Sequence, residues 1–386
     1  MKQVSSFLYL LLAATIAGAQ SYGVGAPPAA APNPITLPDR IRGVTLNLEY
    51  TTPEIVHRAA NYGANFICLS IHVNRGLINN KNPEYFPTAR DPFIPYSKAL
   101  NALDSVLPVC RKENLRVRVG IVPWGRNQDF AWEKESSNID FTSHLYEFWE
   151  SFARRYKSEP AIVMYTIVLE PNGEMLGTWQ DEILPECAKR IRRINPYIWL
   201  GVMPGPWGMP KGFATLKPIN DPYAIYCFHP YSPHSYLHQG VFKGGDRLRA
   251  ADEVGQKYPG MLKMHPGSPL IIWDRKQLEN YIGPAVRFAR QHGVRIFADE
   301  FGVVRWAPGG EIWTEDMISV LEKNGIDWCA FNLCGWNGFN PTFGPEEPRS
   351  TEPFGGKETG VLRIWKKYWA LNGEMSGHNS GSSTTP

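Results

Sequence analysis

The sequence predicts one large α/β domain, a (β/α)8 barrel of the TIM-barrel type. Eight short apolar runs recur along the 386 residues, and most are separated by segments with apolar residues at three- and four-residue spacing. Nearly continuous apolar runs are typical of parallel strands covered on both faces, and the intervening spacing is typical of amphipathic helices. Eight strand–helix units in a chain of this length match such a barrel.

The eight strands are expected at the apolar runs themselves. These are residues 44–48, 66–71, 116–122, 161–169, 197–202, 224–228, 295–300 and 328–333. Helical patterns occupy residues 53–63, 97–114, 142–157, 183–195, 275–293 and 360–371. Several helices are expected to end in a left-handed C-cap, at Gly63, Asn114, Gly293 and Gly325. The alternative, a doubly wound open sheet, is disfavoured because no glycine-rich phosphate loop follows the first run.

The two ends of the chain differ from the barrel in composition. Residues 1–19 combine a positive start, an apolar stretch and a small-residue cleavage site, which predicts a secretory signal peptide; an uncleaved anchor is the alternative. We expect residues 20–38, rich in Pro and Ala, to form a linker or an ordered arm, residues 39–372 the barrel, and residues 373–386 a disordered tail. No later segment is apolar for long enough to span a membrane, so we expect a secreted or periplasmic protein.

Composition limits the classes of partner. A formal net charge of +3 gives no support for a nucleic acid partner. No HxH or HExxH spacing occurs, so we expect no metal and no other cofactor, and we expect a monomer. The 13 Trp and 17 Tyr suit stacking against sugar faces but also plain packing. The six scattered cysteines fit buried free thiols, or one or two disulfide bridges in an exported chain.

Two glutamates end predicted strands on opposite sides of the barrel. Glu170 ends the fourth run, and Glu300 follows Asp299 at the end of the seventh. Active sites of such barrels lie at the carboxyl ends of the strands, so we expect the two carboxyls to face each other across the mouth. One protonated and one ionised carboxyl are what glycoside hydrolysis requires. The alternative is that each glutamate pairs with an Arg or Lys of a loop.

Further candidate residues surround this pair at other strand ends and in the loop after the fifth run. As substrate-binding candidates we name Trp124, Trp207, His229, Tyr231, Asn332 and Trp336. The rings of Trp207 in this set, and of Trp306, Trp313 and Phe339 in the late loops, suit either stacking on a sugar or packing in the core.

The flanks of the two glutamates resemble glycoside hydrolase family 5. Members carry Asn-Glu-Pro at the fourth strand, where this chain has Leu169-Glu170-Pro171. They carry Gly-Glu-Phe-Gly at the seventh, where this chain has Asp299-Glu300-Phe301-Gly302. His229-Pro230-Tyr231 matches the family's His-x-Tyr after the sixth strand, and Trp336 matches its tryptophan after the eighth.

The resemblance implies a retaining hydrolase that acts on carbohydrate. Its substrate would be a polysaccharide or oligosaccharide with β-linked glycosidic bonds, such as a β-glucan, cellulose or a mannan. Glu170 would be the acid/base and Glu300 the nucleophile, with their carboxyls about 5 Å apart. His229 and Tyr231 would line the cleft, with the Tyr231 hydroxyl on the nucleophile, and Trp336 would form the floor of the cleavage subsite.

The chain departs from the family pattern at supporting positions. Leu169 stands where an Asn normally bonds the sugar 2-hydroxyl, and Cys68 where an Arg normally holds the nucleophile. Trp124 and Arg126 occur where a His often ends the third strand. Three accounts stay open: other groups replace the lost ones, the sugar is held differently, or the barrel binds carbohydrate with impaired catalysis. The candidate replacements are His72, Asn74, Arg75 and Arg126; a different barrel hydrolase is a further alternative.

Overall fold

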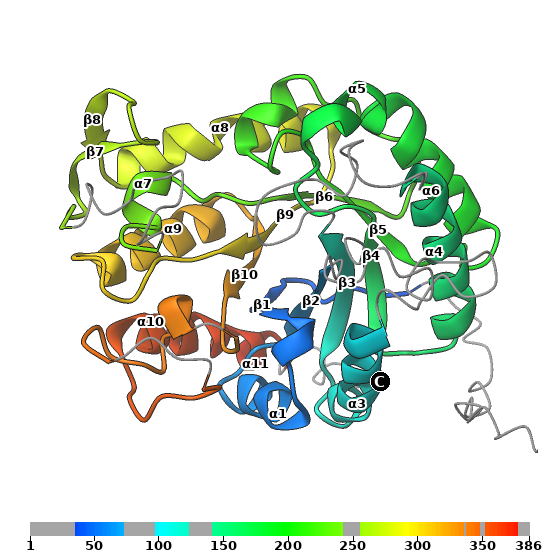
Figure 1. The fold of residues 1–386 in the computed structure, drawn as a ribbon, viewed down its shortest axis with the longest axis horizontal. Helices are drawn as coiled ribbons and strands as arrows, with labels where there is room; N and C mark the ends of the chain where they lie inside the picture. The colour runs from blue at the N-terminus through cyan, green and yellow to red at the C-terminus, as the bar shows by residue number, and fades with distance from the viewer. Residues whose placement is uncertain are drawn as a thin grey trace, which may run out of the picture.

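Eight parallel strands close into a barrel in the computed structural model, in the order β1-β10-β9-β6-β5-β4-β3-β2 (Figure 1). The structure describes residues 35–72, 97–122, 141–241, 255–335, 337–347 and 352–376. The closed parallel barrel with outer helices confirms the predicted fold class, and every strand of it lies within one of the predicted runs to within about two residues. The strands are β1 (Arg42–Asn47), β2 (Phe66–His72), β3 (Arg116–Val122), β4 (Ile162–Thr166), β5 (Trp199–Val202), β6 (Ala224–Phe228), β9 (Ile296–Phe301) and β10 (Asp327–Phe331).

Helices cover the outside of the barrel, and capping residues mark several of their ends. The longer ones are α1 (Pro53–Asn61), α3 (Ser97–Lys112), α4 (Phe141–Tyr156), α6 (Leu184–Arg192), α8 (Arg275–His292), α9 (Gly310–Lys323) and α10 (Gly360–Trp369), followed by α11 (Leu371–Ser376). The Asp274 side chain accepts a hydrogen bond from Gln277 N–H at the start of α8. The four predicted C-cap residues all have positive φ, at 102° for Gly63, 53° for Asn114, 63° for Gly293 and 68° for Gly325.

The chain makes an excursion between β6 and α8 that the apolar pattern did not predict. It contains the short helix α7 (His234–Leu237) and an antiparallel hairpin of β7 (Gly260–Lys263) and β8 (Leu270–Trp273), which form a sheet separate from the barrel (Figure 1). The hairpin strands are only four residues long, and three of the four residues of β8 are exposed. Its pattern therefore lacks the continuous burial that marks the barrel strands.

The core has two parts, one outside the strands and one inside them. Between strands and helices lies a large cluster that includes Trp149, Trp313 and Trp328. The barrel interior is filled by Ile41, Phe66, Cys68, Val122, Val163, Met164, Leu169, Met203, Ile225, Cys227, Phe297 and Cys329. All six cysteines lie within the described residues, and all are buried and free, as expected for thiols that pack as small apolar groups.

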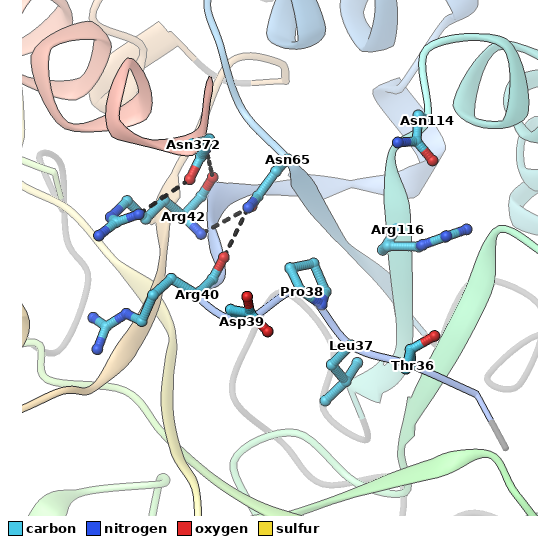
Figure 2. A pocket seen from close by; sticks show the side chains of 10 residues that line it. All are labelled: Thr36, Leu37, Pro38, Asp39, Arg40, Arg42, Asn65, Asn114, Arg116 and Asn372. Atoms are coloured by element: carbon cyan, nitrogen blue, oxygen red, sulfur yellow. Dashed lines mark hydrogen bonds between the residues drawn. The ribbon is translucent and has the colours of Figure 1, made fainter. Parts of the chain in front are cut away.

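The amino ends of the strands are closed by the incoming chain and by a charged cluster. Residues 35–38 cross this end, where Ile35 and Leu37 pack against the interior cluster and Trp199 Nε1 donates to Ile35 O at 2.8 Å. A hollow of about 340 Å³ lies beside them. Figure 2 shows its lining residues, which include Arg40, Arg42 and Arg116. Residues 1–19, where a signal peptide is predicted, and most of the segment 20–38 lie outside the described residues. The helix α11 extends to Ser376, into the expected tail 373–386, and the rest of that tail lies outside the described residues.

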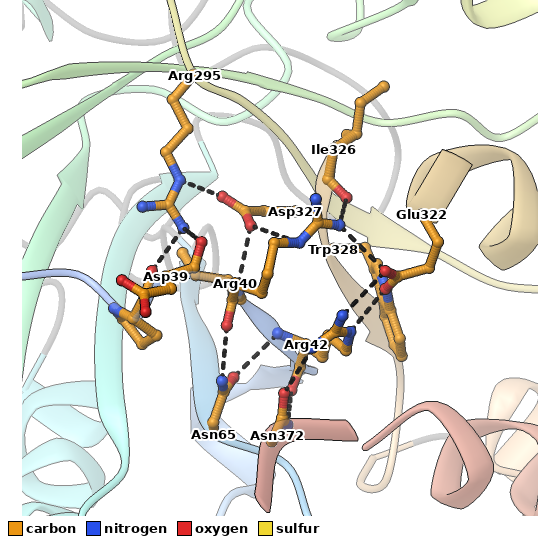
Figure 3. Close-up of polar contacts among 12 residues, drawn as sticks. Asp39, Arg40, Arg42, Asn65, Arg295, Glu322, Ile326, Asp327, Trp328 and Asn372 are labelled. Atoms are coloured by element: carbon orange, nitrogen blue, oxygen red, sulfur yellow. Dashed lines mark hydrogen bonds and ion pairs between the residues drawn. The ribbon is translucent and has the colours of Figure 1, made fainter. Parts of the chain in front are cut away.

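The charged cluster at this end joins β1, α9 and β10 (Figure 3). Glu322 accepts from Arg42 Nε at 2.7 Å and from Trp328 Nε1 at 2.8 Å. Asp327 accepts from Arg295 Nε at 2.5 Å and from Ile41 N–H at 2.9 Å. These bonds tie the first strand to the last, so the cluster acts on barrel closure. We refer to Arg40, Arg42, Arg295, Glu322 and Asp327 as the closing cluster.

Candidate active site

Glu170 stands at the carboxyl end of the fourth barrel strand, as predicted. The ladder of β4 ends at Thr166, and the chain continues to Leu169, whose N–H still donates to Ile121 O at 2.7 Å. Glu170 itself has a φ of 53°, in the left-handed region that a residue with a Cβ rarely adopts. This turn aims its side chain away from the buried run, and that side chain is 15% exposed.

The loop after β5 holds this turn in place. Trp207 N–H donates to Pro171 O at 3.1 Å, and His229 N–H donates to Gly208 O at 2.9 Å. Trp207 is half-buried. The loop therefore bridges the ends of β4 and β6, and it brings the predicted ring of Trp207 to the same end of the barrel as Glu170.

His229 lies between two carboxylates. Its Nδ1 is 2.7 Å from Glu170 Oε1, and its Nε2 is 3.3 Å from Asp299 Oδ1, an ion-pair distance without hydrogen-bond alignment. The histidine side chain is 2% exposed. Burial alone would lower the pKa of His229, but the charges of Glu300 and Asp299 and its contacts with Asp299 and Glu170 raise it well above the ordinary value. The carboxylates on both sides of the ring therefore favour its protonated form.

Glu300 is held by the second aromatic residue of the His-x-Tyr stretch. Tyr231 donates its hydroxyl proton to Glu300 Oε1 at 3.0 Å. Burial raises the pKa of Glu300, and the charges of Glu170 and Asp299 act in the same direction, whereas His229 and the Tyr231 hydroxyl oppose them. Phe339 and His238 pack their rings near Tyr231, at centroid separations of 6.3 Å and 5.2 Å, and fix its orientation.

Two charged residues under the mouth had no role in the sequence-based hypothesis. Arg118, in the middle of β3, donates to Asp299 Oδ2 at 2.8 Å, and both side chains are fully buried. The backbone carbonyl of Asp299 accepts from the Thr45 hydroxyl. Polar groups thus run in contact from Arg118 through Asp299 and His229 to Glu170.

Arg118 lies close to Cys68, the position at which the family has an arginine. Cys68 and Arg118 are direct neighbours in the register of β2 and β3. The arginine is therefore on the adjacent strand, and it reaches Asp299 instead of Glu300. A signal was present in the sequence, because Arg118 places a charge inside a strand that should be covered on both faces.

Leu169 turns into the barrel interior and does not line the mouth. It is 1% exposed and belongs to the interior cluster with Cys68 and Met203. A Cβ at Gly120 would come within 3.0 Å of its Cδ1 and within 2.9 Å of Arg118 Nη1, so both side chains lie over that glycine. The leucine accordingly fills space beside Arg118.

The remaining candidates divide between the site, the core and the undescribed residues. Asn332, at the end of β10, is 3% exposed, and its Oδ1 has no hydrogen-bond partner among the described residues. Trp313 is fully buried and donates to Ser232 O at 3.2 Å, which makes it a packing residue. Trp306 donates to Gln239 O at 2.7 Å. Trp124, Trp336, Asn74, Arg75 and Arg126 lie outside the described residues, and the side chain of His72 is not described.

No group of three or more metal-binding side chains occurs in the described part of the chain. His234 stacks on His238, with ring centroids 4.0 Å apart. Across the same residues, no helix is both long enough and apolar enough to cross a bilayer.

Comparisons with known proteins agree with this geometry. Endoglucanase C of Acetivibrio thermocellus is 26% identical over 253 residues, which cover 60% of this chain and 72% of that protein. Cellodextrinase A of Ruminococcus flavefaciens is 26% identical over 240 residues, or 58% of this chain and 65% of the relative. The fold matches Cel5A of Thermotoga maritima in complex with cellobiose, with a TM-score of 0.63, 19% identity, and coverage of 84% of this chain and 97% of that one. A complex of the same enzyme with mannotriose gives the same TM-score of 0.63.

The family model described as Cellulase (glycosyl hydrolase family 5) matches residues 33–337, which include both glutamates and the polar chain beneath them. On this match the chain belongs to glycosyl hydrolase family 5 and is a glycoside hydrolase of the cellulase type.

Proposed function

We propose that this protein is a retaining hydrolase of β-linked glycosidic bonds, with Glu170 as general acid/base and Glu300 as nucleophile. The observation that carries the proposal is the pairing of each glutamate with its own partner at the mouth. His229 contacts Glu170 at 2.7 Å, and the Tyr231 hydroxyl donates to Glu300 at 3.0 Å. The carboxyls come from the fourth and seventh strands of one barrel, where such sites are built.

The proposed first step forms a covalent glycosyl-enzyme. Glu300 attacks the anomeric carbon while Glu170 gives its proton to the departing glycosidic oxygen. In the second step Glu170 removes a proton from water, which attacks the same carbon and releases Glu300. The Tyr231 hydroxyl favours the ionised form of Glu300 and positions the oxygen that attacks.

Burial and neighbouring charges act on the nucleophile proposed here, Glu300. Burial raises the pKa of Glu300, and the negative charge of Glu170 raises it further, so the pair resists double ionisation. Asp299 adds a third carboxylate, while His229 and Arg118 supply two positive charges. The mechanism requires that Glu170 carry a proton and that Glu300 be ionised when substrate is bound.

The substrate we propose is a β-glucan of the cellulose type or a mannan. The names of the two relatives, an endoglucanase and a cellodextrinase, favour the glucan. The mannotriose complex of the structural neighbour keeps mannan as a candidate. Trp207 and Asn332 are the described residues that we propose as sugar contacts, together with Trp124 and Trp336. We further propose that the protein acts as an exported monomer, secreted or periplasmic, after removal of residues 1–19.

A carbohydrate-binding barrel with impaired catalysis is the second candidate. It is favoured by Leu169, which is turned into the interior and so makes no contact with a sugar 2-hydroxyl. That contact strengthens in the transition state of related hydrolases, so its loss would lower kcat more than affinity.

The test is sugar release from cellulose-like β-glucans, mannans and xylans by wild type, Glu170→Gln and Glu300→Gln. Glu322→Gln is the matched control, since it makes the same change at the opposite end of the barrel. We expect both site variants to lose on the order of 10³-fold or more in kcat/KM on the polymer that wild type cleaves. The control should keep wild-type activity per folded molecule.

A fluorinated activated glycoside distinguishes the roles of the two glutamates. The 2-deoxy-2-fluoro sugar slows hydrolysis of the glycosyl-enzyme, so mass spectrometry should find the label on the peptide that contains Glu300. A label on the Glu170 peptide would reverse the assignment. Binding of one polymer without any cleavage by wild type would select the second candidate.

A further inference from the structure

A fully buried ion pair lies directly beneath the two glutamates and serves no evident purpose in the fold. Arg118 and Asp299 are each 0% exposed, and they join the middle of β3 to the end of β9 across the barrel interior. Such a pair is a poor source of stability, because two charges leave water for one bond. The surroundings are thiols and aliphatic groups, among them Cys68, Cys227 and Cys329.

The pair is also incompletely satisfied on the side that faces the mouth. Arg118 Nε, Asp299 Oδ1 and His229 Nε2 have no hydrogen-bond partner among the described residues. Asp299 Oδ1 and His229 Nε2 nevertheless lie 3.3 Å apart. One oxygen of Asp299 is thus held by Arg118, and the other faces the ring that contacts Glu170.

We propose that Arg118 and Asp299 are positioning residues: Arg118 holds Asp299 in place, and the Asp299 carboxylate directs the His229 ring at Glu170 and favours its cationic form. The inference rests on the proposed function, and it gives the buried arginine beside Cys68 a role at His229 and not at the nucleophile. Asp299 stands where the family resemblance has a glycine, and Arg118 is the register neighbour of Cys68. The small thiol at position 68 leaves interior space for the guanidinium at position 118.

Several charged or titratable groups face the His229 ring, from three other strands and from its own. They are Glu170 after β4, Asp299 and Glu300 on β9, Arg118 on β3 behind Asp299, and Tyr231 two residues further along the chain. Removal of Asp299 takes away the negative charge on one side of the ring and leaves Arg118 as a cation behind it. Both changes disfavour the imidazolium.

The cation matters most when Glu170 has given up its proton. Glu170 then becomes a carboxylate inside a site that also holds Asp299 and the esterified Glu300. A proton on His229 Nδ1 donates to that carboxylate at the observed 2.7 Å and stabilises it. In the second step the same contact keeps Glu170 oriented as a base toward water. The proton of His229 is not consumed, so the ring acts by charge and position.

The experiment compares Asp299→Asn with Asp327→Asn in the full chain. Asp327 is a buried aspartate paired with Arg295 at the opposite end of the barrel, so it controls for the loss of any buried ion pair. The first readout is the ring ¹⁵N and ¹³C spectrum of histidine-labelled protein, with His229 assigned by its absence in His229→Gln. In wild type and in Asp327→Asn we expect His229 to keep its proton to a pH well above the ordinary value for histidine. In Asp299→Asn it should lose its proton at a pH lower by about one unit or more.

The second readout is the pH profile of kcat and KM on the polymer that wild type cleaves. Asp299→Asn should lower kcat by about 10- to 100-fold, change KM by less than about 3-fold, and shift the basic limb to lower pH. Arg118→Lys should restore part of the kcat that Arg118→Met loses, because it keeps the cation that holds Asp299 in place. The double variant Arg118→Met/Asp299→Asn removes both charges. It is the control for misfolding that a single unpaired buried charge would cause in either single variant.

The two readouts separate this inference from the proposed function. A wild-type His229 titration and a wild-type pH profile in Asp299→Asn would overturn the positioning role. An inactive wild type would overturn the proposed function, and the ring spectrum would still test the inference. Equal shifts in Asp299→Asn and Asp327→Asn would also overturn it, since they would trace the effect to general loss of structure.

Discussion

Both ends of the barrel hold arginines and carboxylates, but the two ends differ in how fully the carboxylate oxygens are hydrogen-bonded. At the amino end, Asp327 and Glu322 use their oxygens on Arg295, Arg42, the Ile41 N–H and the Trp328 indole (Figure 3). At the carboxyl end, Asp299 keeps one oxygen without a hydrogen bond. The arginines and carboxylates of the closing cluster thus join strands to one another. At the mouth, Asp299 keeps one oxygen directed at the neighbouring His229 ring.

The difference shows why a buried charge is not by itself a sign of function. Both ends of the barrel contain buried charged side chains, and Asp327 is buried like Asp299. The separating feature is whether the remaining polar atoms have partners, because unsatisfied buried groups are disfavoured unless a function retains them. Among the described residues, the closing cluster has one such atom, Arg40 Nε, whereas Asp299 Oδ1, His229 Nε2 and Asn332 Oδ1 are such atoms at the mouth.

The largest expected effect on stability lies at the closing cluster. Asp327→Asn should lower the free energy of unfolding by about 3 kcal/mol, because it leaves Arg295 without its carboxylate and weakens the link from β10 to β1. Activity per folded molecule should stay at the wild-type value. Urea unfolding followed by tryptophan fluorescence, with kinetics on the native protein, measures both. Loss of activity without loss of stability would break the contrast between the two ends.

A somewhat smaller loss of stability is expected from restoring the family residue at position 169. Leu169→Asn buries an amide in the apolar interior beside Arg118, so it should lower the free energy of unfolding by about 2–3 kcal/mol. Because the side chain points inward, kcat should not rise. The matched control is Leu169→Met, which keeps volume and polarity and should cost less than about 1.5 kcal/mol. A rise in kcat for Leu169→Asn would mean that the side chain reaches the sugar.

The sequence predicted the frame of the barrel because its signals are local. Apolar runs mark strands that are covered on both faces, and the positive φ at Gly63 or Gly293 is set by the residue itself. Glu170, His229, Tyr231 and Glu300 were found at strand ends for the same reason. The contacts that the structure places among them support, but do not themselves test, the catalytic roles.

The sequence did not locate Arg118, because a strand covered on both faces does not reveal which side chains point inward. The replacement for the arginine missing at position 68 was sought at strand ends and loops, in His72, Asn74, Arg75 and Arg126. The buried arginine lies in the middle of the neighbouring strand, and only the register of β2 against β3 brings it there. The β7–β8 hairpin was missed because its short strands leave Met261, Leu270 and Ile272 exposed.

Removal of one hydroxyl group at the mouth should have a smaller effect. Tyr231→Phe removes the donor to Glu300 Oε1, which should lower kcat by about 10-fold, or about 1.4 kcal/mol in barrier, with little change in KM. The acidic limb of the pH profile should move upward, because loss of the donor raises the pKa of Glu300 further. Tyr236→Phe is the matched control, since this buried tyrosine donates to Pro308 O at 3.0 Å. Equal kinetic losses in both variants would assign the effect to packing.

The smallest effect has opposite signs at the two ends of the barrel. The pKa of Glu300 is raised above 4.5 by burial, so the folded protein binds that proton more tightly than the unfolded chain, and stability falls as pH rises through the folded pKa. His229, with its pKa raised above 6.5, has the same sign: its contribution is full below about pH 6.5 and is lost at higher pH. Glu322 differs, because hydrogen bonds from Arg42 and Trp328 outweigh burial and lower its pKa, so its contribution is present above 4.5 and lost in acid.

Glutamine variants at the two positions should therefore diverge from wild type in opposite directions, Glu322→Gln below pH 4.5 and Glu300→Gln between pH 4.5 and pH 7. Glu300→Gln should become more stable than wild type by about 1 kcal/mol at pH 7, as expected when a buried site carboxylate is removed. Glu322→Gln should approach wild type in acid, lose stability relative to wild type as pH rises to 4.5, and keep a constant deficit at higher pH. Thermal unfolding across this pH range measures both differences. If both variants lost stability relative to wild type with rising pH, the folded protein would stabilise the carboxylate of Glu300 as it does that of Glu322. The mouth would then be a second closing cluster.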